Sequence, residues 1–132
     1  MSLATLIAER EAFRERQAKG LTAEELQRHL RINPYMCPCC RKQMRAPKAR
    51  LGGHRASRPI RTRGHLLPNL PSNAGVYRRF IYQCFVCNGD QAAMTFYGWL
   101  QYLVWKRDPR APYVFQTLMA LLELGVNPEE LQ

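Results

Sequence analysis

The sequence predicts an α+β fold in which a small zinc-bound core is flanked by helices at both ends. Two C-x-x-C pairs, beginning at Cys37 and Cys84, enclose two candidate strands. Apolar residues at helical spacing occur before and after this middle part. The chain of 132 residues has the length of one domain. We divide it into an N-terminal helical segment (1–33), a zinc-bound core (34–94) and C-terminal helices (95–132).

Two helices are expected before the core. Ser2 can cap the first, which carries an apolar stripe and is ended by Gly20. A capping box that begins at Thr22 starts the second helix, which should run to about Arg31 before Pro34 stops it. These helices are expected to form scaffold or a surface that faces a partner.

The middle of the chain should contain a basic loop, two strands and a short helix. Residues 41–58 are rich in Arg, Gly and Pro, which is typical of an irregular loop. One strand is predicted at 59–67 and a second at 76–83. Both faces of the second strand carry bulky residues, so its register stays open. A tight turn at the second C-x-x-C pair follows, and Asn88 should begin the helix.

Two further helices are expected after the core. Thr95 is a suitable cap for a helix that runs to about Arg107, and the two prolines of segment 108–112 should end it. The last helix is predicted at 113–124. It is more apolar than a small surface helix needs, so it either completes the core or pairs with another subunit.

Four of the five cysteines have the spacing of a zinc site. The predicted ligands are Cys37, Cys40, Cys84 and Cys87. Cys39 is left over because it does not complete a C-x-x-C pair. Four thiolates leave no open position for water, so such a zinc would serve folding. The alternatives are an iron–sulfur cluster, which the long basic insert disfavours, and a set of buried free thiols.

The positive charge is concentrated in the core. The formal charge is +10 and the sequence pI about 9.9, yet residues 36–89 contain no Asp or Glu. A one-signed segment beside a metal site predicts phosphate binding and therefore a nucleic-acid partner, with simple solubility as the alternative. The predicted contacts are Arg41, Lys42, Arg45, Lys48, Arg50, Arg55, Arg58, Arg61, Arg78 and Arg79.

The cysteine pattern and hydropathy predict a reducing, cytoplasmic setting. The number of cysteines is odd, no signal-peptide pattern opens the sequence, and no apolar run reaches the length of a membrane span.

The order of these motifs resembles the HNH endonucleases of the ββα-metal (His-Me finger) superfamily, over residues 35–103. A C-x-x-C pair, a strand with His65, a second strand and C-x-x-C-Asn follow one another in that order. HNH proteins usually have an acidic residue or a His directly before the catalytic His, where this chain has Gly64. Arg63-Gly64-His65 is instead similar to the R-G-H core of the non-specific nucleases of the superfamily, and Thr62 replaces their Asp.

The resemblance implies a treble-clef-like ββα-metal core and hydrolysis of phosphodiester bonds in double-stranded DNA, or in RNA, with low sequence specificity. His65 would be the general base, Asn88 a ligand of Mg²⁺ or Mn²⁺, and Arg63 an electrostatic stabiliser. Asn73 would brace the loop that orients His65. The implied setting is a bacterial or phage-infected cell.

Three alternatives accompany this interpretation. His65 is an ordinary strand residue in one of them, and Asn88 only caps a helix in another. In the third, the chain is a catalytically inactive zinc module of the same fold that binds nucleic acid or protein. The terminal helices are candidates for contact with a second copy or a protein partner.

Overall fold

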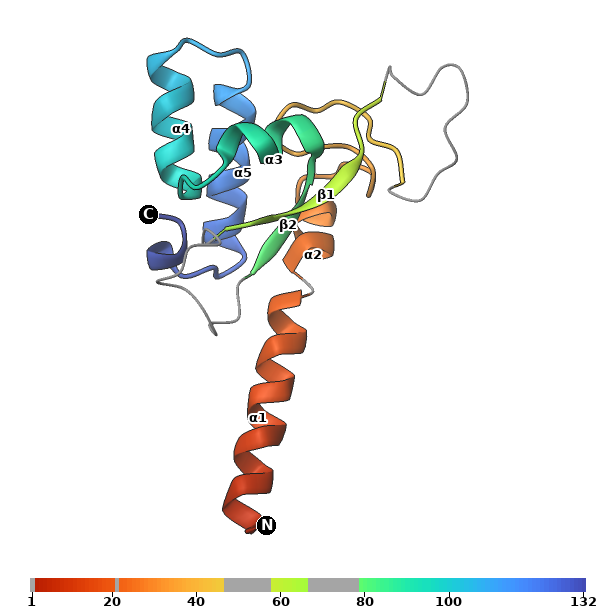
Figure 1. The fold of residues 1–132 in the computed structure, drawn as a ribbon, viewed down its shortest axis with the longest axis vertical. Coiled ribbons are helices and arrows are strands. Elements are labelled where there is room, and N and C mark those ends of the chain that lie inside the picture. The colour runs from red at the N-terminus through yellow and green to blue at the C-terminus, as the bar shows by residue number, and fades with distance from the viewer. Residues whose placement is uncertain (1, 21, 47–57, 67–78) are drawn as a thin grey trace.

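The computed structural model describes residues 2–20, 22–46, 58–66 and 79–132. In chain order its elements are α1 (Leu3–Gly20), α2 (Thr22–His29), β1 (Arg61–His65), β2 (Phe80–Cys84), α3 (Phe85–Gln91), α4 (Phe96–Trp105), α5 (Ala111–Glu123) and a 3₁₀ turn, Pro128–Glu130. The described residues form a mixed α+β fold with five α-helices and one two-stranded antiparallel hairpin (Figure 1). This architecture confirms the predicted fold class at that level.

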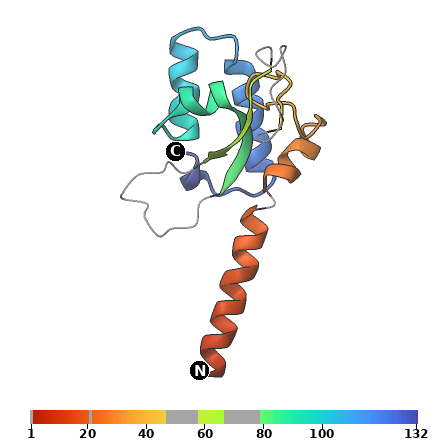
Figure 2. The ribbon, with the colours of Figure 1, turned by 45° about the vertical axis from the view of Figure 1, so that its right-hand side comes forward.

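The two N-terminal helices differ in how they contact the rest of the chain. Figures 1 and 2 both show α1 extending away from the other elements. Thr5 N donates a hydrogen bond to the Ser2 hydroxyl at 3.2 Å, so Ser2 caps this helix as predicted. In contrast, α2 packs against β2 and buries Ala23 and Leu26 completely. The core therefore begins at α2.

The hairpin has two chemically different faces. β1 and β2 pair with Arg61 opposite Cys84 and His65 opposite Phe80. Side chains alternate along a strand, and directly paired residues share a face. The buried face carries Thr62, Gly64, Ile81 and Gln83, of which the last three are fully buried. The open face carries Arg61, Arg63, His65, Phe80 and Tyr82, all of them partly or fully exposed.

β1 is shorter than predicted, whereas β2 ends at Cys84, one residue after its predicted end. Strand 59–67 was expected, but Ile60 forms an isolated parallel bridge with Arg45 instead of pairing with β2. The expected start of the second strand, at residue 76, lies outside the described residues. The residue Arg45, which follows the first C-x-x-C pair, thus pairs with the chain just before β1.

Two helices begin earlier than predicted. Asn88 was expected to start α3, but Cys84 already caps that helix because its sulfur accepts a hydrogen bond from Cys87 N at 3.4 Å. Helix α5 includes Pro112, which was expected to precede it. A proline fits the first turn of a helix because no hydrogen bond is required from its nitrogen there.

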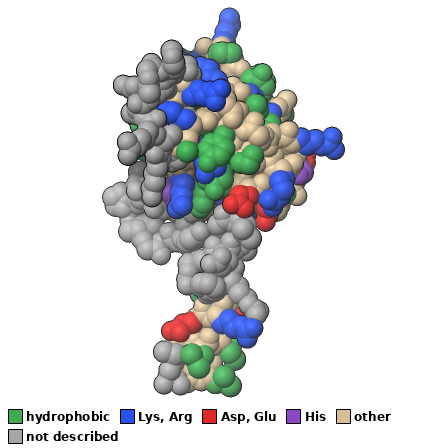
Figure 3. Space-filling model, turned by 90° about the vertical axis from the view of Figure 1, so that its right-hand side faces the viewer, with side chains coloured by type: hydrophobic (Ala, Val, Ile, Leu, Met, Phe, Trp, Pro, Cys, Tyr) green, Lys and Arg blue, Asp and Glu red, His purple; other side chains and the backbone are tan. Residues whose placement is uncertain are grey.

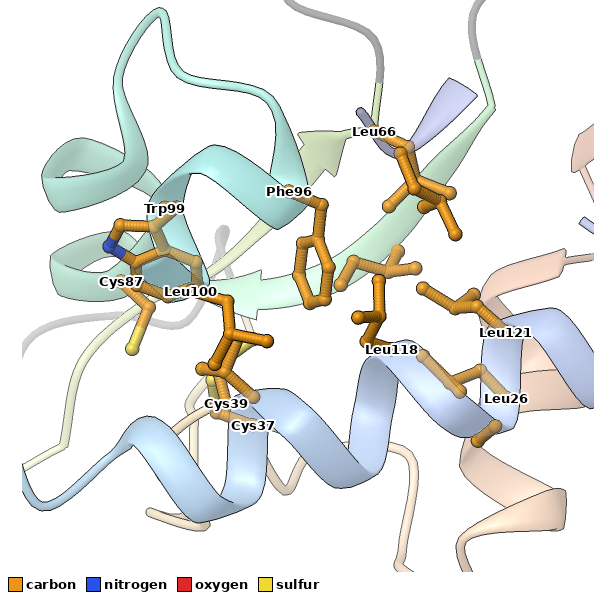
Figure 4. Close-up of a cluster of buried hydrophobic side chains, with 14 of the residues drawn as sticks. Leu26, Cys37, Cys39, Leu66, Cys87, Phe96, Trp99, Leu100, Leu118 and Leu121 are labelled. Atoms are coloured by element: carbon orange, nitrogen blue, oxygen red, sulfur yellow. The ribbon is translucent and has the colours of Figure 1, made fainter. Parts of the chain in front are cut away.

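The core joins the buried face of the hairpin to α2, α4 and α5 (Figure 4). Thr95 caps α4 as predicted, by accepting a hydrogen bond from Gly98 N at 3.1 Å. Phe96 and Trp99 of α4 pack edge to face with ring centroids 6.0 Å apart. Leu121 and its apolar neighbours on α5 are buried, so the last helix completes the core.

Candidate metal centre and hairpin site

The first C-x-x-C pair folds as a tight turn. Arg41 N donates a hydrogen bond to Cys37 O at 2.7 Å, and Cys37 N donates one to Lys42 O at 2.9 Å. Arg41 has a φ of +62°, in the left-handed region that residues other than glycine rarely adopt. Its guanidinium donates to Pro38 O at 3.1 Å and to Gln116 Oε1 at 3.0 Å. These bonds hold the turn in shape and tie it to α5.

The second C-x-x-C pair lies at the junction of β2 and α3. Cys84 N donates a hydrogen bond to Cys37 Sγ at 3.4 Å, so the backbone of this pair contacts a sulfur of the first. Phe85 N donates to Ile60 O at 2.8 Å, which fastens the junction to the residue before β1. Residues distant in sequence are therefore held together at the end of the hairpin.

The four predicted ligands form a cluster that could hold a metal ion. The sulfurs of Cys37, Cys40, Cys84 and Cys87 all lie within 4.8 Å of one another. Those of Cys40 and Cys84 are 3.8 Å apart. A tetrahedral zinc–thiolate centre has Zn–S bonds of about 2.3 Å, and hence sulfur–sulfur distances of about 3.8 Å. The cluster is consistent with a structural zinc, and it is the only group of three or more His, Cys, Asp or Glu that the described residues bring together in this way.

The thiols need a cation if all of them are to ionise. Hydrogen bonding with neighbouring thiols, first of all with Cys39, raises the pKa of Cys37 to about 12. The pKa values of Cys40 and Cys87 are raised as well, mainly by hydrogen bonding with Cys37. The pKa of Cys84 is lowered because Cys37 and the other thiols donate to its sulfur. A bound Zn²⁺ would stabilise the thiolate form of all four ligands.

A charged network borders the sulfurs. Arg110 Nη1 lies 3.7 Å from Cys87 Sγ, and Arg110 Nη2 pairs with Asp90 at 2.8 Å and with Asp108 at 2.9 Å. The hydrogen bonds from Arg110 lower the pKa of Asp108 to about 2. Trp99 Nε1 donates to Asp90 at 2.9 Å. The network places a guanidinium beside the Cys87 sulfur and links α3, α4 and the segment before α5.

Asn88 lies inside α3 and contacts β1. Its Nδ2 donates to Thr62 Oγ1 at 3.0 Å, and that hydroxyl donates to Gln83 O at 2.8 Å. Because Cys84 caps the helix, the alternative that Asn88 serves as the cap is wrong. No hydrogen bond to Asn88 Oδ1 occurs among the residues that the structure places. Such a carboxamide oxygen is a ligand type that Mg²⁺ prefers.

His65 lies on the open face with Arg63. The His65 ring centroid is 6.2 Å from that of Phe80, and the Arg63 guanidinium lies 5.1 Å from the centre of the same ring. Thr62, which binds Asn88, faces the other side of the strand. The structure thus groups His65 with Arg63 and places the Asn88 carboxamide against the opposite face of the hairpin.

Gln83, which was not among the predicted site residues, occupies the space beside Gly64. A Cβ added at Gly64 would lie 1.6 Å from Gln83 Oε1. Gln83 is fully buried, and its Nε2 donates to Gln91 Oε1 at 3.0 Å and to Cys39 Sγ at 3.4 Å. Its Oε1 has no hydrogen-bond partner in the described part of the chain. The sequence feature that could have identified Gln83 is its position in a predicted strand, directly before the predicted zinc ligand Cys84.

Arg61 is held between two aromatic rings on the open face. Its guanidinium carbon lies 4.2 Å from the ring centre of Tyr35 and 4.1 Å from that of Tyr82. Tyr35 lies two residues before the first C-x-x-C pair and was not among the predicted site residues. A stacked guanidinium keeps its N–H groups in the plane between the rings, where they can reach a phosphate.

The other predicted contact residues have varied surroundings. Lys42 and Arg58 are exposed, and Arg45 Nε donates to Arg58 O at 3.1 Å. Arg79 forms an ion pair with Glu130 at 3.3 Å, so its charge is partly neutralised. The predicted site residues that lie outside the described residues are Lys48, Arg50, Arg55, Asn73 and Arg78.

Comparison of the chain with protein-family models, with curated proteins and with solved structures gave no match. The HNH resemblance therefore stays a prediction from the sequence. The four-cysteine cluster and the mixed α+β fold rest on the structure itself. None of the described helices is long and apolar enough to span a membrane.

Proposed function

We propose that this protein is a zinc-stabilised nucleic-acid-binding protein that contacts the phosphate backbone with the open face of its hairpin. The observation that supports this proposal is the pairing of cations with aromatic rings on that face. Arg61 stacks on tyrosines and Arg63 on Phe80. Arginines oriented in this way lose little side-chain freedom when they bind a phosphate.

The charge distribution supports the same proposal. Residues 36–89, which include the hairpin, contain no acidic residue, and the net charge of the chain is +10. Asp90 and Asp108, which follow this segment, are paired with Arg110. Double-stranded DNA is the proposed partner, and sequence preference should be low because phosphate contacts carry no base information.

Metal-dependent phosphodiester hydrolysis is a second candidate, as the HNH resemblance implies. It is favoured by the Asn88 carboxamide, which Thr62 holds through Nδ2 while Oδ1 accepts no bond from the described residues. That oxygen would bind Mg²⁺ or Mn²⁺. His65 would accept the proton of a water molecule, and Arg63 would stabilise charge on the phosphate.

Two features of the hairpin rank binding above hydrolysis. Gln83 fills the space that an acidic ligand at position 64 would need. The His65 ring and the Asn88 carboxamide face opposite sides of the hairpin, whereas a reacting phosphate must contact both the base and the metal. Neither feature opposes binding of the phosphate backbone.

Replacement of Arg63 tests the binding surface. We expect Arg63→Ala to weaken binding of a labelled DNA duplex and to lower the slope of log Kd against log salt concentration by about one, because one phosphate contact is lost. Fluorescence anisotropy at several salt concentrations measures both quantities. The matched control is Arg107→Gln, which removes an exposed charge after α4 and should leave the slope unchanged. Equal slopes for the wild type and Arg63→Ala would argue against contact between the open face and the DNA backbone.

A plasmid nicking assay with Mg²⁺ or Mn²⁺ separates the two candidates. We expect the wild type and His65→Ala to bind DNA with retained zinc and to leave it uncut, because Asn88 and His65 face apart. Cleavage by the wild type that His65→Ala abolishes, with DNA binding and zinc content preserved, would establish hydrolysis instead.

A further inference from the structure

A second surface lies beside the four-cysteine cluster. It is a groove of about 860 Å³ between the first C-x-x-C turn, the start of α3 and the start of α5. Ligand sites typically have volumes of about 300–1,000 Å³. None of the residues of the open face lines this groove. The groove is therefore distinct from the surface proposed above for the DNA backbone.

One side of the groove is cationic. Lys42, Arg45 and Arg58 line it, and the bond from Arg45 Nε to Arg58 O joins two of them. The acidic residues that also line the groove, Asp90 and Asp108, are both paired with Arg110. Lys42, Arg45, Arg58 and Arg110 bring four positive charges to the groove, against two negative charges from Asp90 and Asp108. The charged side chains that line it therefore have a net positive charge, which a negatively charged ligand complements. Figure 3 shows one face of the molecule, on which Lys and Arg side chains lie beside exposed hydrophobic ones.

The groove also presents apolar side chains that the core does not use. Phe85 is 65% exposed, Val86 62% and Tyr113 39%. Phe85 lies between two predicted zinc ligands, and its backbone N–H is bonded to Ile60 O. The backbone that carries this ring is thus fixed while the ring faces solvent. An exposed aromatic ring on a fixed backbone beside cations can stack on an unpaired base.

We propose that the groove binds a short stretch of single-stranded nucleic acid, with phosphates on Lys42, Arg45 and Arg58 and a base stacked on Phe85. A duplex could use only the cations, because its bases are already stacked on one another. An unpaired strand uses both the charge and the aromatic ring. The proposal rests on the proposed nucleic-acid binding and adds a surface that distinguishes unpaired strands from duplexes.

The test measures binding of a labelled single-stranded oligonucleotide and of its duplex by fluorescence anisotropy. Phe85→Ala removes the stacking surface for one base and should weaken single-strand binding by about tenfold. Phe85→Trp keeps a stacking surface and should preserve it. Duplex affinity should be unchanged in both variants. The matched control is Trp105→Ala on α4, which removes a 79% exposed ring outside the groove and should affect neither ligand.

The outcomes separate this proposal from the proposed function. If Phe85→Ala loses single-strand affinity while Phe85→Trp and Trp105→Ala keep it, and zinc content is retained, the result supports single-strand binding in the groove. Equal single-strand affinity in the wild type and Phe85→Ala, with duplex binding still dependent on Arg63, overturns the groove and leaves the proposed function in place. A wild type that binds neither ligand overturns both. Binding of a polyglutamate peptide that depends on Phe85, without such dependence for the oligonucleotide, would assign the groove to an acidic protein segment and overturn the proposal.

Discussion

The Cα of Gly64 leaves room for the buried carboxamide of Gln83. That carboxamide links the hairpin to α3 through Gln91 and to the first C-x-x-C turn through Cys39. Buried polar groups that are hydrogen-bonded hold their elements in one arrangement, because any other arrangement leaves the groups unpaired. Packing across the hairpin therefore accounts for the glycine directly before His65.

Alanine at position 64 tests this packing. We expect Gly64→Ala to lower the free energy of unfolding by about 1–3 kcal/mol, because the new methyl group would overlap Gln83 Oε1. The matched control is Gly89→Ala in α3, where an added Cβ meets nothing within 4 Å. It should raise the free energy of unfolding by about 0.5–1 kcal/mol. Urea denaturation measures both changes, and an undiminished stability of Gly64→Ala would show that Gln83 moves aside easily.

The spacing of residues in the sequence correctly predicted side chains whose role depends on residues a few positions away. The four clustered cysteines and the helix caps Ser2 and Thr95 belong to this group. Gln83 and Tyr35 were missed because their partners, Gly64 and Arg61, are distant in the chain. The Gln83–Gly64 pair depends on the register of the hairpin, and the Tyr35–Arg61 pair on where the segment before the first C-x-x-C pair lies. Sequence spacing predicts neither.

At the scale of elements, the hairpin depends on what surrounds it. A two-stranded hairpin alone is marginally stable in water. Here Cys84 ends β2, caps α3 and points its sulfur at the cluster. This triple role also explains why α3 begins before the predicted residue, Asn88. Sequence patterns for helix starts favour oxygen-bearing side chains, so capping by a sulfur was not anticipated.

Cysteine substitutions test which sulfurs hold zinc. We expect Cys84→Ala to lose the zinc and to unfold the hairpin, because three remaining thiols leave an incomplete tetrahedron. Cys39→Ala should retain one zinc per chain and lose only some stability, since Gln83 Nε2 keeps its bond to Gln91. Metal analysis of the purified proteins and circular dichroism give the two readouts. Zinc loss in Cys39→Ala, with zinc kept in Cys84→Ala, would reverse the assignment of the ligands.

At the scale of the whole molecule, the described core lies after α1 in the chain. The buried apolar residues connect α2, the hairpin, α4 and α5, whereas the side chains of Leu3, Leu6 and Ile7 in α1 are 73%, 50% and 49% exposed. The sequence predicted α1 correctly as a helix from its cap and spacing. It could not show that the apolar stripe faces away from the core, because amphipathic spacing is the same whichever surface covers it.

Removal of α1 tests how independent the core is of this helix. We expect a chain that lacks residues 1–20 to keep its zinc and to change its free energy of unfolding by less than about 0.5 kcal/mol, because none of the described side chains of α1 belongs to the core cluster. Leu121→Ala is the contrasting variant, since that side chain is fully buried and its loss should cost about 2–5 kcal/mol. Thermal and urea unfolding should be measured at several protein concentrations. If the truncated chain loses a stability that depended on concentration in the full chain, the stripe around Leu6 pairs with a second copy, and α1 is then part of an interface between subunits.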